Sequence, residues 1–142
     1  MKNNLKELIS NWNSSDSITE RENISESIIS QAVAYIECRY LLNSKYQHDK
    51  DWPDWGYNGP KRGSWTMDDD PTLLNYYDSW RYGGESHAGF RIKPEEIDSF
   101  DPVEYEKNLV NIKTKRLEAE IVRAENEVVK AKKNLDDFFN GK

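Results

Sequence analysis

The segment 76–92, YYDSWRYGGESHAGFRI, concentrates side chains that could bind or transform a ligand. Its aromatic rings could stack on a flat ligand, and its two arginines could bind an anionic group through bidentate hydrogen bonds. Its histidine, His87, could exchange a proton near neutral pH. The same segment also reads as a β-hairpin in which the aromatics are cross-strand partners.

The stacking interpretation extends over residues 52–91, where aromatic and arginine side chains are dense. We expect about half of the rings to be core, because short strands need large side chains to bury enough area. The rings in the Gly/Pro-rich part are typical of interfaces, because loop aromatics are less often needed for packing. The residues predicted to bind a ligand or partner are Trp52, Trp55, Arg62, Trp65, Tyr77, Arg81 and Arg91.

Catalysis has weaker support from the sequence. The chain has two histidines, His48 and His87, which could lie near a serine. Neither is surrounded by a nucleophile elbow, a paired-carboxylate pattern or a phosphate-binding glycine loop. We therefore predict no catalytic residue, and a small hydrolase using His48 or His87 remains an alternative.

An acidic run at residues 68–70 could supply metal ligands together with His48 and the aspartates of residues 49–54. The spacing matches neither a calcium-binding loop nor a zinc pattern. We expect an ordinary acidic loop ending at Pro71, with no metal and no other cofactor.

The net charge of −6 is concentrated in residues 46–101, which hold 12 acidic and 6 basic side chains. Binding to duplex nucleic acid requires a cationic stripe that displaces counterions, so this class of partner is disfavoured. An acidic inhibitor that mimics nucleic acid, or a surface that meets a basic protein, stays open.

Apolar runs in this sequence are too short to cross a bilayer, and Met1 is not followed by an apolar signal region. We expect a cytoplasmic protein without a membrane partner. The single cysteine, Cys38, forms no disulfide within the chain and is expected to be an inert thiol in a helix.

Two helices are predicted at the N-terminus. Leu5, Leu8, Ile9 and Trp12 follow helical spacing, which indicates a helix over residues 4–12. A second helix is expected over residues 19–44, begun by a capping box at Ser17 and Glu20 or at Asn23 and Glu26. Its broad apolar stripe predicts cover by a sheet or by other helices.

A small antiparallel sheet is predicted over about residues 62–92. Glycine and proline break this region into short candidate strands, which are Arg62–Met67, Thr72–Tyr82 and Ala88–Ile92. In the middle strand, alternation places Leu74 and Tyr76 on one face and Tyr77 on the other. Gly83 and Gly84 supply the reversal.

The C-terminal helix has the clearest pattern. Asp101 is a predicted N-cap followed by proline, and an apolar heptad seam then continues for about four heptads. Such a seam must be covered by the helix around residues 24–44, by another copy of the chain, or by both. We expect an α+β domain over residues 1–100 and an oligomerisation helix, like that of a coiled coil, over residues 101–142. The residues predicted to join copies of the chain are Leu117, Ile121, Ala124, Val128 and Leu135.

The order of the C-terminal elements resembles that of small proteins encoded by bacteriophages. These elements are a strand ending in Trp80-Arg-Tyr-Gly-Gly84, a second strand, a turn at Lys93–Ile97 and a long charged helix. Some of these are anti-defence factors, including the Thoeris anti-defence sponges, which sequester nucleotide-like signals. The heptad seam predicts the homo-oligomer, and the missing catalytic motifs predict a non-catalytic binding protein. The resemblance implies a phage-encoded factor that counteracts a host defence or regulatory component. It would do so by sequestering a small nucleotide-like ligand or by inhibiting a host protein directly.

Overall fold

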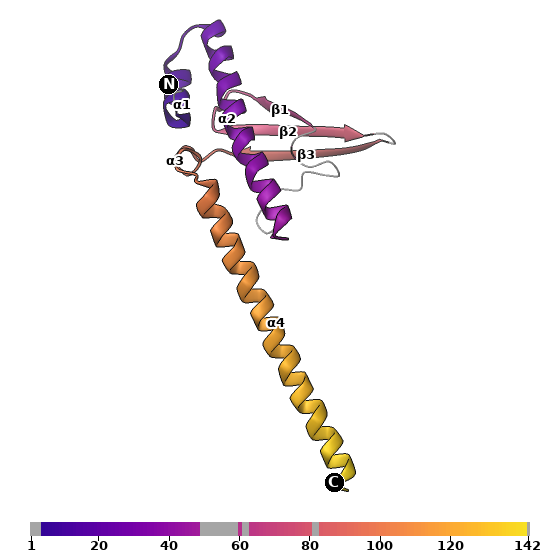
Figure 1. Cartoon of the computed structure of the whole chain (residues 1–142). Helices are drawn as coiled ribbons and strands as arrows, with labels where there is room; N and C mark the ends of the chain where they lie inside the picture. The colour runs from indigo at the N-terminus through magenta and orange to yellow at the C-terminus, as the bar shows by residue number, and fades with distance from the viewer. Residues whose placement is uncertain (1–3, 49–59, 61–62, 81–82, 142) are drawn as a thin grey trace.

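The computed structural model describes residues 4–48, 60, 63–80 and 83–141. The order of elements is two helices, three strands, a short helix and a long helix, as in Figure 1. The helices are α1 (Leu5–Ser14), α2 (Ile18–Lys45), α3 (Pro94–Asp98) and α4 (Pro102–Phe139), and the strands are β1 (Ser64–Met67), β2 (Leu73–Trp80) and β3 (Gly84–Arg91). The predicted α+β class, with two N-terminal helices and a long C-terminal helix, is confirmed.

Local capping explains where the N-terminal helices begin. The Asn4 side chain accepts a hydrogen bond from the Glu7 amide, at 2.8 Å, in front of α1. The Ser17 hydroxyl accepts one from the Glu20 amide, at 3.3 Å, in front of α2. Of the two predicted caps for the second helix, the structure therefore uses the one at Ser17, because a helix begins where its first free amides are satisfied.

The sheet is antiparallel with the strand order β1-β2-β3. β3 begins at Gly84, four residues earlier than the predicted Ala88, and Gly83 turns the chain with a φ of +82°. The early start follows from the register, because Ser79 in β2 pairs with Glu85 and Trp80 pairs with Gly84. Glu85 and Ser86 give no apolar signal, so this half of the strand was missed.

One face of the sheet forms the core with α1 and α2. Leu74 joins Leu5 of α1 and Ile28 of α2 in one cluster, and Tyr76 joins Ile36 of α2 in a second. The predicted alternation in β2 is confirmed, since Leu74 and Tyr76 are fully buried whereas Tyr77 is exposed. Figure 1 shows α2 crossing the sheet on this inner face.

The segment after β3 ties the start of α4 to the N-terminus. Residues 94–98 form the helix α3, where the sequence indicated only a turn. The Asp98 carboxylate accepts hydrogen bonds from the amides of Leu5 and Lys6, at 2.8 and 3.1 Å, and so caps α1. Asp101 then caps α4 as predicted, and the helix runs away from the sheet in Figure 1.

Candidate functional site

The outer face of the sheet carries an exposed cluster of Tyr77, His87 and Glu85. Tyr77 and His87 are cross-strand partners in β2 and β3, and their ring centroids lie 4.9 Å apart. The Tyr77 hydroxyl donates to one oxygen of the Glu85 carboxylate at 3.4 Å. The other oxygen of that carboxylate lies 3.3 Å from His87 Nε2. Glu85 therefore holds both rings in place on an otherwise open surface.

A second polar cluster closes the end of the same face. The Arg91 guanidinium donates to the Asp70 carboxylate at 2.6 Å and to the Thr72 hydroxyl at 2.7 Å. The hydroxyl and amide of Thr72 in turn donate to Asp70 at 2.6 and 2.9 Å. These bonds from Thr72, with Arg91 beside them, lower the pKa of Asp70 to about 2. The acidic loop thus has a structural role, as a brace for β3.

The predicted aromatic and arginine residues do not all share one face. Tyr77 and Arg91 lie on the outer face, whereas Trp65 is half-buried on the inner face. The Trp65 indole donates to the Pro60 carbonyl at 3.0 Å, and its ring centroid lies 4.9 Å from that of Tyr76. Four other predicted residues lie outside the described part of the chain, namely Trp52, Trp55, Arg62 and Arg81.

Side chains considered for catalysis occupy separate places. His48 follows the end of α2, where its amide donates to the Asn43 carbonyl at 2.8 Å, whereas His87 lies on the outer sheet face. Cys38 lines an open depression of about 510 Å³ between α2 and the segment from α3 to the first residue of α4. Burial, together with the nearby Glu106, raises the pKa of its thiol. A raised pKa disfavours the thiolate, so Cys38 is not an activated nucleophile.

A polar network that sequence reasoning missed fixes α4 to α2. Arg39 donates to the hydroxyl of Tyr35 at 2.8 Å and to that of Tyr105 at 3.2 Å. Tyr105 donates to the buried amide oxygen of Asn43 at 2.7 Å. The Tyr35 hydroxyl, whose pKa is raised by burial, donates to Glu96 in α3 at 3.3 Å. These four bonds connect residues of α2, α3 and α4, so three helices meet at this network.

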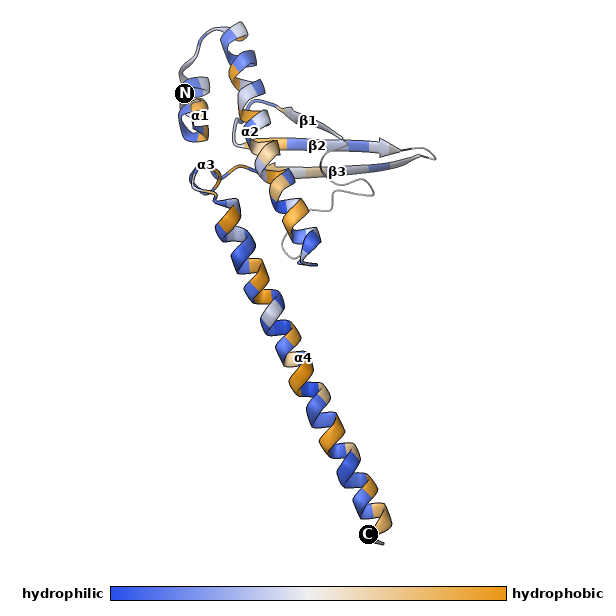
Figure 2. Cartoon of the chain, viewed as in Figure 1, coloured by the Kyte–Doolittle hydropathy of each residue, from blue (hydrophilic) through white to orange (hydrophobic). Residues whose placement is uncertain are grey.

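The seam of α4 is exposed along its length. Four of the predicted oligomerisation residues are between 47% and 57% exposed in the single chain, namely Leu117, Ile121, Val128 and Leu135. Figure 2 shows apolar patches recurring along this helix. Of the residues in α4, the structure buries Leu109, near the contact with α2.

Comparison with known protein families, with curated proteins and with solved structures gives no match to this chain. Among the described residues, histidine, cysteine and acidic side chains do not gather in a group of three or more that could hold a metal ion. Within the same residues, no helix has both the length and the apolar character needed to traverse a bilayer.

Proposed function

We propose that the protein is a non-catalytic binding protein whose outer sheet face contacts a protein partner. The observation that supports this most is Tyr77, which is 42% exposed and yet is held by His87 and Glu85. A side chain that is already ordered loses little conformational freedom on binding, so more of its contact energy becomes affinity. Tyrosine and arginine are also enriched among residues that dominate binding.

The surroundings of His87 favour binding over catalysis. Its imidazole is 64% exposed, and its ionic neighbour Glu85 is 57% exposed. Electrostatic catalysis depends on groups fixed in a site that excludes water, because their charges are then poorly screened. An open position on a sheet is suited to a contact surface.

The setting that we propose is a phage-encoded factor that counteracts a defence or regulatory component in the host cytoplasm, as the resemblance implies. Direct inhibition of a protein is favoured over sequestration of a nucleotide-like signal, because Trp65 lies on the face opposite Tyr77 and Arg91. It is favoured over mimicry of nucleic acid, because Arg91 adds positive charge to the acidic groups of this face.

Affinity capture from a bacterial host lysate tests the proposal with the wild type and two variants. Tyr77→Ala removes the exposed ring, whereas Phe139→Ala removes an exposed ring at the far end of α4. We expect one protein to be retained by the wild type and by Phe139→Ala, and to bind Tyr77→Ala at least about tenfold more weakly, as for a residue that dominates an interface. Equal retention by all three proteins, with unchanged melting temperatures, would place the site elsewhere.

A nucleotide released by heating the purified protein would support sequestration instead. That result contradicts the proposal if the captured protein is also unaffected by Tyr77→Ala.

A further inference from the structure

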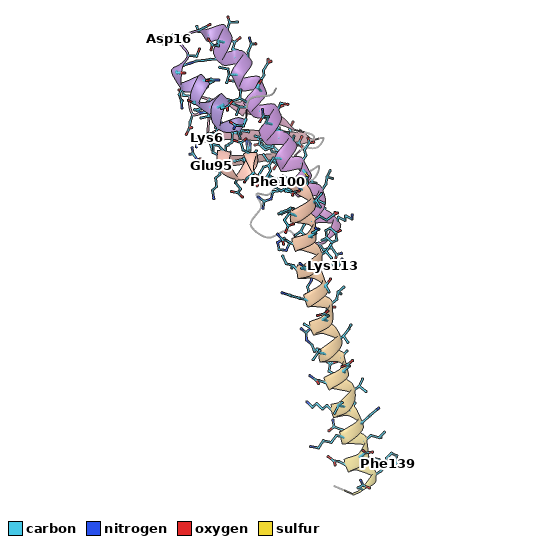
Figure 3. All side chains as sticks on the ribbon, turned by 60° about the vertical axis from the view of Figure 1, so that its left-hand side comes forward. Lys6, Asp16, Glu95, Phe100, Lys113 and Phe139 are labelled. Atoms are coloured by element: carbon cyan, nitrogen blue, oxygen red, sulfur yellow. The ribbon has the colours of Figure 1, made fainter. Side chains whose placement is uncertain are left out.

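We infer that the apolar seam of α4 is covered by a second copy of the chain, aligned parallel and in register. The seam consists of Val110, Thr114, Leu117, Ile121, Ala124, Val128, Ala131, Leu135 and Phe138. Figures 1 and 3 view the chain from two directions, and in both the C-terminal half of α4 has no other described helix or strand beside it; beyond the Lys113 labelled in Figure 3, Arg116 still bonds to the Tyr46 carbonyl at 3.3 Å. The surface is independent of the sheet face, so this inference does not rest on the proposed function.

The body of the protein docks on a different side of α4. On α4, the contacts with α2 and its C-cap residue Tyr46 are made by four residues. Tyr105 bonds to Arg39, Glu106 bonds to Lys45, Arg116 bonds to the Tyr46 carbonyl, and Leu109 is buried. With the seam at heptad positions a and d, Tyr105, Leu109 and Arg116 occupy positions f and c on the outer side of the helix, and Glu106 occupies position g beside the first residues of the seam. Among the described residues, the packing of α4 against the body therefore leaves the seam from Leu117 to Phe138 exposed.

The period of the seam indicates what kind of partner covers it. Its members alternate spacings of four and three residues from Val110 to Phe138, which gives an average of 3.5. A straight helix has 3.6 residues per turn, so a strict heptad pattern stays on one side only when two helices wind around each other. A second α4 has this same period and the same length, and so it matches the seam throughout.

Residue types in the seam favour two parallel strands. Position a holds the β-branched residues Thr114, Ile121 and Val128, followed by Leu135, and position d holds Leu117 among smaller or aromatic residues. β-Branched residues at position a with leucine at position d favour parallel dimers, and the three β-branched residues with Leu117 follow this pattern. Ala124 and Ala131 at position d allow the two helices to approach closely.

Charges beside the seam favour the same orientation. In a parallel pair, each position g faces a position e five residues later in the other copy. The contacts between copies are then Lys113 with Glu118, Glu120 with Glu125, and Glu127 with Lys132. The first and the last pair attract, and the middle pair repels.

An antiparallel pair with full overlap brings g next to g and e next to e. Its charged contacts would be Glu118 with Glu125 and Glu120 with Glu127. All of these are repulsive, so the parallel arrangement is favoured electrostatically.

Analytical ultracentrifugation of the full chain tests the assembly. We expect a dimer at micromolar concentration. In the double variant Leu117→Asp/Ile121→Asp, we expect the dissociation constant of the dimer to rise about a thousandfold or more, because buried unpaired charges are rarely tolerated. Both seam residues are exposed within one chain, so circular dichroism should show the body still folded. A monomeric wild type at these concentrations would overturn the inference.

Charge reversal at Glu127 and Lys132 tests the orientation. Each single change, Glu127→Lys or Lys132→Glu, turns an attractive pair of the parallel dimer into a repulsive one, and the pair occurs twice. We expect about tenfold weaker dimerisation for either single variant and recovery in the double variant. The matched control is Lys133→Glu, which makes the same charge change at an outward position f and should have little effect.

The antiparallel pair gives a different pattern. There, Glu127→Lys would meet Glu120 of the other copy and strengthen the dimer, and Lys132→Glu would face the neutral Asn111. A stronger dimer for Glu127→Lys would therefore contradict the parallel arrangement.

Discussion

Asp70 shows how one side chain of the acidic run shapes the candidate binding face. Its carboxylate accepts hydrogen bonds from Thr72, directly before β2, and from Arg91 at the end of β3. This joins two strands at the edge of the outer face. The same bonds account for the lowered pKa of Asp70, because each of them favours the charged form.

We predict a pH-dependent role for Asp70 in stability. Its pKa in the folded protein, about 2, lies below the ordinary value of 3.8, so its contribution is fully present above about pH 4. The contribution is lost as the pH falls through the folded pKa. Urea unfolding of the wild type and of Asp70→Ala should show a stability gap that is constant from pH 7 to pH 5 and that narrows between pH 4 and pH 2.

Asp69→Ala is the control, because it removes a neighbouring exposed carboxylate. If the difference in unfolding free energy between the wild type and Asp70→Ala stayed the same at pH 2, the carboxylate would stabilise the fold without its charge.

Among the elements, α4 depends on the hydrogen bonds that hold its first turns against α2. Arg39, Tyr105 and Asn43 form the central part of this contact, and the Asn43 side chain is buried. A buried polar group that loses its partner costs more than the bond itself was worth, because it is no longer solvated. The orientation of the long helix relative to the sheet therefore depends on a few polar groups.

Tyr105→Phe should destabilise the protein by about 1–3 kcal/mol, because it leaves the Asn43 oxygen and Arg39 Nε without this hydroxyl. Tyr77→Phe removes a hydroxyl from the exposed sheet face, and its effect should stay within about 0.5 kcal/mol. Chemical denaturation of both variants measures the difference. Equal stabilities would mean that apolar contacts alone fix α4.

Much of the element pattern could be predicted from the sequence, because it rests on local signals. The cap at Ser17, the alternation of Leu74, Tyr76 and Tyr77, and the N-cap at Asp101 each depend on neighbours within a few residues. The polar start of β3 carried no such signal. Arg39 and Tyr105 lie 66 residues apart in the sequence, so their contact required the fold.

The candidate site was only partly predictable for the same reason. Strand alternation placed Tyr77 on the face away from the core, and the structure confirms this. Trp65 belongs to the neighbouring strand, and its register against β2 sets it beside Tyr76 on the inner face. Glu85 gained its role only through the pairing of β2 with β3, which aligns it near Tyr77 and His87.

For the whole molecule, a parallel pair of α4 helices would carry both sheets at the same end. α4 has 38 residues and so is about 57 Å long at 1.5 Å per residue. Two binding faces held together raise the apparent affinity for a partner that itself has two copies of its site, provided that the spacing allows both contacts. This consequence rests on the proposed function, whereas the dimer itself does not.

Disulfide trapping tests the parallel dimer most directly. Ala131 occupies position d, and in a parallel pair it faces its own counterpart at a distance that a disulfide can bridge. In the antiparallel pair with full overlap, the two copies of Ala131 would lie about 25 Å apart along the axis. The experiment oxidises Ala131→Cys in a Cys38→Ser background, with Lys133→Cys as the outward-facing control. We predict that Ala131→Cys becomes a covalent dimer on a non-reducing gel while Lys133→Cys stays a single chain. A dimer in solution that fails to trap at Ala131→Cys, or that traps equally at both positions, would contradict the account.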